Sequence, residues 1–219
     1  MDDIYLKKRQ SKGNYTNFRL TLRAQTLADL LAKNRHRAPE RILDIGTADG
    51  MVLSLIARAL KAKQAIGVDI VEKGLRVDSA EKRNRVSLAL ADCQNLPFKN
   101  DTFDILIASA VIEHIHNTDT VLQEAKRVLK KGGQLCISVP NPFFDWVNTK
   151  LVKTYHVRRF TVRKMLQLLA ANDLQLVSTC HFMLFPFGRI PFENFIIGAL
   201  RALRIEFILF NRVFIVSKS

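Results

Sequence analysis

The sequence predicts an α/β protein built on a doubly wound parallel sheet. Short apolar runs alternate with helical patterns along residues 41–139, and a small-residue turn with Gly46 and Gly50 follows the first run. Acidic residues, Asp69 and Asp92, stand at the ends of the second and third runs. Ligands of such sheets bind at the carboxyl ends of the strands, so the functional residues are expected along one edge of the sheet.

The composition favours a single globular domain with a strongly basic surface. A chain of 219 residues is long enough for one sizeable α/β core. The net charge of +14 predicts attraction to polyanions, whether nucleic acid, anionic lipid or acidic substrates. The three cysteines, Cys93, Cys136 and Cys180, are far apart in the sequence. They are predicted to be buried thiols, which is typical of a protein in a reducing compartment. Without an apolar signal region or an uncharged membrane-spanning stretch, a cytoplasmic protein is expected.

The first strand, turn and helix lie in the segment RILDIGTADG and the apolar run that follows it. A strand ending in Asp44 is expected, then the turn, then a helix over about 50–62. Gly46 can take the positive φ that such a turn needs. Because the spacing is Gly-x-Ala-x-Gly and Asp49 would repel a phosphate at the helix start, a cofactor without phosphates fits better than a dinucleotide. A turn that serves packing alone is the simpler alternative.

The other elements follow in order along the chain. A basic segment with a helix over about 16–33 occupies residues 1–38. Strands are expected over 65–69, 86–91, 103–109 and 134–139, with helices over about 72–84 and 118–130. The second of these helices is expected to end with Lys130 and Lys131 in its last turn and Gly132 as a left-handed cap. Beyond residue 143 we expect a helix over about 161–172 and strands over 174–182 and 212–217.

The segment from Asp44 to Gly50 resembles motif I of the class I S-adenosylmethionine (SAM)-dependent methyltransferases, of the methyltransferase type 11 kind. The strings E-H-I, R-V-L-K-K-G-G and S-V-P-N, at residues 113–115, 127–133 and 138–141, are the most specific part of this resemblance, which spans about 40–142. It implies a Rossmann-like seven-stranded sheet, mostly parallel with an antiparallel last strand. It also implies a single methyltransferase domain over 39–219, in which 143–210 forms the substrate side, and SAM as the cofactor.

The same resemblance implies where SAM is held. Asp69 follows Gly46 by 23 positions and would accept hydrogen bonds from the ribose hydroxyls, unless it only caps the next helix. Asp92 would accept from the adenine amine and the main chain of Cys93 would reach a ring nitrogen, although Asp is also common in turns. The complete expected set of cofactor-binding residues is Asp44, Gly46, Thr47, Ala48, Gly50, Asp69, Ile70, Asp92, Cys93 and Ser109.

His114 is the best-placed candidate for a general base, because it follows the fourth strand and an imidazole can accept a proton near neutral pH. A structural role on the cofactor side is the alternative, and His156 is a second candidate base. Glu113 and His114 are adjacent and would point in different directions, so no metal site is expected.

The substrate side combines a basic stretch over 150–164 with an apolar helix that begins at about Phe192. Such a helix must be buried, dimerised or laid into a lipid interface, and a core-covering helix is the simplest of these. We therefore expect a methyltransferase acting on a small-molecule, lipid-like or lipid-linked acceptor, with an anionic membrane surface as a candidate partner. An RNA or protein acceptor is the alternative, although no RNA-binding signature is present, and a non-catalytic binding module is the third hypothesis.

Overall fold

The structure is a computed structural model that describes residues 13–35, 37–72, 75, 86–142, 156–183, 193–205 and 209–218. Its strands are β1 (Arg41–Ile45), β2 (Gln64–Asp69), β3 (Val86–Leu90), β4 (Phe103–Ser109), β5 (Leu129–Pro140), β6 (Leu174–Phe182) and β7 (Asn211–Lys218). Its helices are α2 (Gly13–Lys33), α3 (Met51–Ala59), the short 3-10 helix η2 (Ile112–His114), α5 (Thr118–Val128), α7 (Val162–Ala171) and α8 (Glu193–Ala202). The first 12 residues and nearly all of the helix expected over 72–84 lie outside the described residues.

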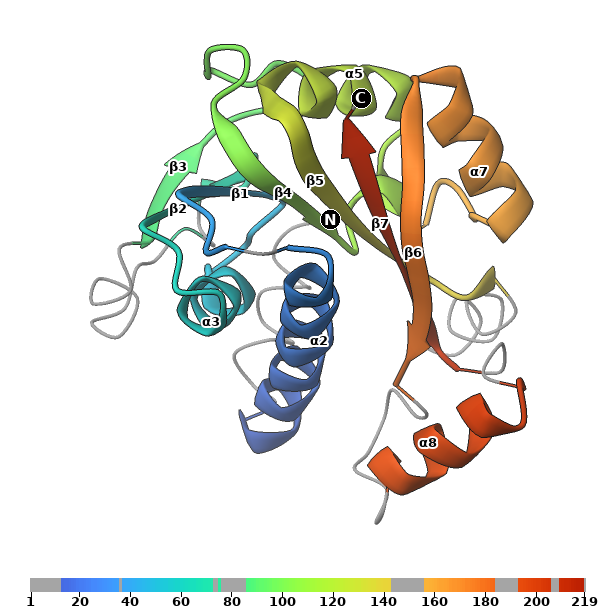
Figure 1. Ribbon diagram of the computed structural model, residues 1–219. Coiled ribbons are helices and arrows are strands. Elements are labelled where there is room, and N and C mark those ends of the chain that lie inside the picture. Colours follow the sequence, from blue (N-terminus) through green and yellow to red (C-terminus); the bar gives the residue numbers. More distant parts are fainter. Residues whose placement is uncertain are drawn as a thin grey trace.

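The strands form one sheet in the order β3-β2-β1-β4-β5-β7-β6 (Figure 1). Strands β1 to β5 pair in parallel, whereas β7 runs antiparallel to both β5 and β6. The predicted Rossmann-like sheet with an antiparallel last strand is therefore confirmed. The strand order reverses between β1 and β4, and a crevice at the carboxyl ends of these two strands is where such folds bind ligands.

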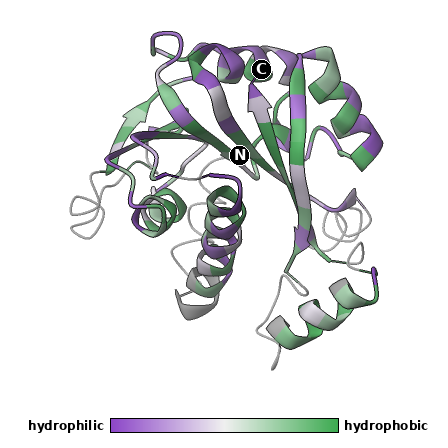
Figure 2. Cartoon of the chain, in the orientation of Figure 1, coloured by the Kyte–Doolittle hydropathy of each residue, from purple (hydrophilic) through white to green (hydrophobic). Residues whose placement is uncertain are grey.

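Helices cover both faces of the sheet, because successive side chains of each strand point to opposite sides. On one face α2 and α3 bury Leu27 and Leu53 in the same cluster as Ile42 of β1. On the other face α5 and α7 bury Val121, Leu122, Met165 and Leu169 in the same cluster as Leu43 of β1. In the hydropathy colouring, the central strands carry long apolar stretches (Figure 2).

Helix α5 ends two residues earlier than the sequence predicted, so the placement of Lys130 and Lys131 in its last turn is wrong. The carbonyl groups of Arg127 and Val128 accept backbone hydrogen bonds from the loop before β4, at 3.0 and 2.8 Å. These bonds draw the chain into β5, which begins with the next residue. Gly132 does have the expected left-handed conformation (φ +69°), but inside β5 and not at a helix end.

Helix α8 lies at the same edge of the sheet as the crevice. It follows the carboxyl end of β6, which runs parallel to β5, and it precedes the start of β7 (Figure 1). Its Ile197 is 7% exposed, whereas Phe195 is 78% exposed, so the predicted apolar helix is only partly packed onto its surroundings. Among the described residues, no helix combines the length and the apolarity that crossing a membrane requires.

Candidate active site

The turn after β1 has the backbone conformation that the sequence predicted. Gly46 and Gly50 have φ of +69° and +77°, and Ala48 also lies in the left-handed region at +53°. The amides of Gly46 and Thr47 both donate to the carbonyl of Val68 in β2, at 2.8 and 3.1 Å. A Cβ on Gly46 would overlap the side chain of Val111, which follows β4. The turn therefore lies directly against the chain that leaves β4.

Asp69 fixes this turn from the end of β2. One carboxylate oxygen accepts from the amide of Ala48 at 2.8 Å, and the other accepts from the amide of Val71 at 3.0 Å. Each carboxylate oxygen has a second lone pair, so Asp69 can still accept from the hydroxyls of a ribose. The predicted ribose ligand thus has a second task that the sequence did not reveal, which is to close the glycine turn.

Gly67, in the middle of β2, is a further requirement of the site that sequence reasoning missed. A Cβ at this position would come within 2.6 Å of the Thr47 side chain and 2.7 Å of Leu88. Glycine at this position lets the side chain of the turn residue Thr47 pack directly against β2. Its signal in the sequence is a lone glycine inside a strand pattern, which often marks a close approach of another part of the chain.

The chain leaving β3 turns at Asp92, as an Asp after a strand commonly does. The Asp92 carboxylate accepts from the amide of Gln94 at 2.9 Å, and its carbonyl accepts from the amide of Asn95 at 3.0 Å. Burial, with a smaller effect from the charge of Asp92, raises the pKa of the Cys93 thiol to about 11. Cys93 therefore stays a neutral thiol at pH 7, which suits a residue expected to contribute its main chain.

Arg127 holds this loop in place from α5, a role that sequence reasoning did not assign. Its guanidinium donates to the carbonyls of Leu96 (2.9 Å) and Phe98 (2.7 Å) and pairs with Glu124 (2.7 Å). Glu124 in turn accepts from the amide of Leu96 at 2.8 Å. The hydrogen bonds from Arg127 hold the pKa of Glu124 below its usual range, so the ion pair between the two residues is intact at neutral pH.

Replacing Arg127 with methionine is expected to destabilise the protein and to weaken SAM binding. The change removes the donors to two loop carbonyls and leaves Glu124 without its cation, which costs about 2–3 kcal/mol. Thermal unfolding should shift by about 5–10 °C for a chain of this size, and calorimetry should show a several-fold weaker affinity for SAM. Lys126 is half-buried on the same helix and pairs with Asp173 at 3.0 Å, so Lys126→Met is the matched control. Equal losses for the two variants would contradict the role of Arg127 in holding the loop.

The chain leaving β4 is anchored to β5. The hydroxyls of Ser109 and Ser138 are 2.8 Å apart, and the amide of Ala110, with φ +59°, donates to the carbonyl of Ser138 at 3.0 Å. This strained step turns the chain into η2, which carries Glu113 and His114. The predicted contact residue Ser109 thus lies at the crevice edge of the sheet, beside the turn after β1.

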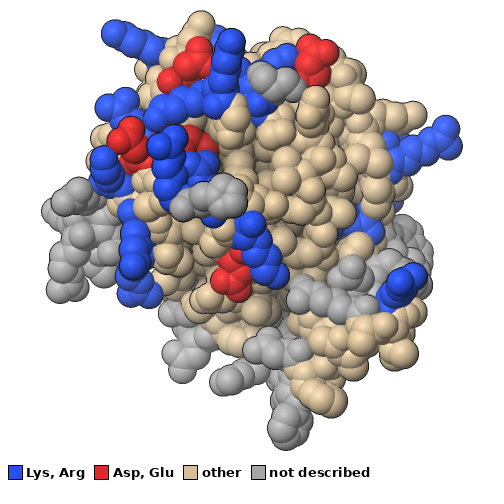
Figure 3. Space-filling view, in the orientation of Figure 1, with Lys and Arg blue, Asp and Glu red and all other residues tan. Residues whose placement is uncertain are grey.

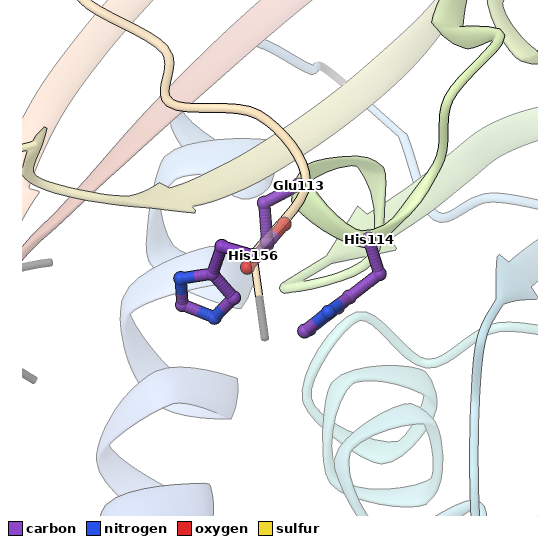
Figure 4. Close-up of side chains that lie close together, drawn as sticks. All are labelled: Glu113, His114 and His156. Atoms are coloured by element: carbon purple, nitrogen blue, oxygen red, sulfur yellow. The ribbon is translucent and has the colours of Figure 1, made fainter. Parts of the chain in front are cut away.

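Glu113, His114 and His156 come together where η2 meets the segment before α7 (Figure 4). The rings of His114 and His156 stand edge to face with their centroids 4.9 Å apart. The carbonyl of Glu113 accepts from the amides of Val157 (2.8 Å) and Arg158 (3.1 Å). The two candidate bases are therefore neighbours, although 42 residues of the chain separate them.

Carboxylates lie near the glycine turn, at the edge of the sheet where the crevice is expected. Asp49 accepts from the amide of Met51 at 3.1 Å and places its charge at the start of α3, while Asp44 is buried near the end of β1. The hydroxyl of Thr47 is buried and has no hydrogen-bond partner within the described part of the chain. This edge therefore combines negative charge and small residues with the Thr47 hydroxyl. Such a surface fits a cationic, phosphate-free molecule such as SAM better than it fits a nucleotide phosphate.

Comparison with known proteins agrees with this geometry. Residues 43–137 match the Methyltransf_11 family, described as a methyltransferase domain. The ubiquinone/menaquinone biosynthesis C-methyltransferase UbiE of Cereibacter sphaeroides is 28% identical over 146 residues, which cover 63% of this chain and 56% of UbiE. The sterol 4-C-methyltransferase strm-1 of Caenorhabditis elegans is 32% identical over 121 residues, which cover 52% of this chain and 36% of that protein.

The fold also matches solved structures. An SAM-dependent methyltransferase from Methanosarcina mazei superimposes with a TM-score of 0.64 and 15% identity, covering 86% of this chain and 96% of that one. The two curated relatives are aligned over only about half of their length or less. Residues 43–137 therefore match the methyltransferase-domain family, and the chain has the fold of the class I SAM-dependent methyltransferases.

Proposed function

We propose that this chain transfers a methyl group from SAM to a small, lipid-like acceptor. The observation that carries the proposal is the Asp69 carboxylate, which closes the glycine turn through Ala48 and keeps lone pairs for a ribose. The family uses SAM as methyl donor, and its turn and acidic strand ends are all present at one edge of this sheet.

The chain's own contribution to catalysis would be alignment. SAM supplies a methyl group already activated by a positively charged sulfur, and holding the two reactants in line can supply much of the rate. The glycine turn and Asp69 would fix the ribose end, and the loop at Asp92 and Cys93 would fix the adenine. Ser109 and η2 would then border the acceptor, because they leave β4 next to the turn.

Two observations support a lipid-like acceptor. The relatives reported above include enzymes named for quinone and sterol methylation. At the crevice edge α8 exposes apolar side chains, with Phe195 78% and, just beyond the helix, Leu203 68% exposed. In the face drawn in Figure 3, most lysines and arginines gather at the upper left, whereas the described atoms at the lower right, where α8 lies, are largely uncharged apart from a basic group beside them.

Calorimetry with SAM tests the activity class, since a binding module that had lost the cofactor would give no heat. Co-sedimentation with vesicles that contain anionic lipid then tests the acceptor class. Removing one exposed Phe side chain from an interface costs about 1.5–3 kcal/mol, so Phe195→Ser should weaken the affinity for the vesicles about tenfold or more. Val177→Ser, 45% exposed at the amino-terminal half of β6, is the matched control and should bind as the parent does.

An RNA acceptor is the competing outcome of the same experiment. The net charge of +14 favours attraction to any polyanion, so charge alone does not choose between RNA and anionic lipid. Binding to RNA that weakens steeply with salt, together with vesicle binding that does not depend on Phe195, would replace the lipid-like acceptor with a nucleic acid.

A further inference from the structure

We propose that Glu113, His114 and His156 form a binding site for a first-row divalent transition-metal cation, with Zn²⁺ the best fit. One ligand atom from each side chain lies within 4.8 Å of the other two. The ligand set of two imidazoles and one carboxylate is one that zinc takes in catalytic sites, with an open fourth position. The proposal concerns metal binding itself and goes beyond methyl transfer.

The three side chains converge although the sequence argued against it. Glu113 and His114 are adjacent in η2 and alone could not surround an ion. His156 supplies the third direction, and Figure 4 shows both rings and the carboxylate gathered around the junction of the two segments. Zinc–ligand bonds of about 2.0–2.2 Å place tetrahedral ligand atoms about 3.3 Å apart, so small side-chain rotations would bring the three atoms into position.

The backbone holds these ligands in place. Two amides, those of Val157 and Arg158, donate to the carbonyl of Glu113, so the residue after His156 is bonded directly to a ligand-bearing residue. The Arg158 side chain also donates to the buried hydroxyl of Thr118 at the start of α5, at 3.1 Å. A site whose ligands are positioned before the ion arrives loses less entropy on binding than one that must assemble.

The three side chains differ in burial. Glu113 is 2% exposed, whereas His114 and His156 are half-buried. An ion would be held from the interior by the carboxylate and reached from the surface past the two rings. Imidazole ligands favour zinc, copper, iron or nickel over Mg²⁺ and Ca²⁺, which prefer oxygen ligands. If the proposed function holds, an oxygen atom of the acceptor could take the open position.

Titration of the metal-free chain with ZnCl₂ in a calorimeter tests the site, with Co²⁺ absorption as a readout of tetrahedral geometry. One equivalent of Zn²⁺ should bind, and millimolar Mg²⁺ should not compete with it. Changing an outer partner of a metal ligand already costs 10–100-fold in affinity, so His156→Gln and Glu113→Gln should each lose about 100-fold or more. His116→Gln, an exposed histidine two residues from His114, is the matched control and should bind as the parent does.

The outcomes separate this proposal from the proposed function. Failure to take up one equivalent, or uptake that His156→Gln leaves unchanged while circular dichroism shows a folded chain, overturns the metal site. SAM binding is measured on the same preparation. If the chain binds SAM but not zinc, only the proposal of a metal site is overturned. If it binds zinc but not SAM, only the proposed methyltransferase activity is overturned. Because His156 is half-buried and glutamine is of similar size, this variant keeps the test valid if Glu113→Gln fails to fold.

Discussion

Replacing Asp69 with alanine is expected to weaken SAM binding by about 100-fold, or about 3 kcal/mol. The loss has two parts, because the carboxylate would accept from the ribose and does accept from the amide of Ala48 at 2.8 Å. Without it the left-handed turn at Ala48 loses one of the hydrogen bonds that hold it closed, and the amide is left without its acceptor. Calorimetric titration with SAM measures the change directly.

Two variants make the test specific. Asp69→Asn keeps one acceptor oxygen and loses the charge, so its affinity should lie between those of the parent and Asp69→Ala. Asp29→Ala removes an exposed carboxylate from α2, where Asp29 accepts from Gln25 at 3.3 Å, and should bind SAM as the parent does. If correctly folded Asp69→Ala held SAM as tightly as the parent, the assignment of this edge as the cofactor site would be wrong.

The sequence predicted the position of Asp69 and a contact with a ribose, but not its hydrogen bond to the turn. The interval from Gly46 and the strand pattern are local, so they could be read directly from the chain. The hydrogen bond to Ala48 joins residues 21 apart and exists only because β1 and β2 pair in parallel with Asp44 beside Gly67. Such partners depend on the register of the sheet, which no local pattern contains.

The same limit explains His156 and the end of α5. His156 was predicted only as a second base, because nothing near it in sequence points to the carbonyl of Glu113 that receives the amides of the next two residues. The helix was predicted to run through Lys130, since its lysines and Gly132 fit a helix end. Pairing of β5 with β4 overrode that local preference, because the carbonyls at 127 and 128 found partners in the loop before β4.

Replacing Gly46 with alanine is expected to cost about 3–4 kcal/mol of folding free energy, which lowers the midpoint of thermal unfolding by about 10 °C. A positive φ alone costs about 1–2 kcal/mol for a residue with a Cβ. The remainder comes from overlap with Val111, whose Cγ1 would lie 3.1 Å from the new Cβ and whose Cγ2 would lie closer still. SAM affinity should fall as well, because relief of the overlap moves the turn away from the chain that leaves β4.

Gly132→Ala separates these two contributions, because Gly132 has the same φ of +69° but nothing within 4 Å of its Cβ position. It should lose only about 1–2 kcal/mol and keep its affinity for SAM. Adding Val111→Ala to Gly46→Ala should restore about 1–2 kcal/mol relative to the sum of the single changes. If the two glycine variants lose equal stability, or if the effects of Gly46→Ala and Val111→Ala simply add, then backbone strain alone explains the glycine at position 46. In the proposed function, the close contact between the turn and the chain leaving β4 would place donor and acceptor side by side, so the energy of this contact is a direct test of that arrangement.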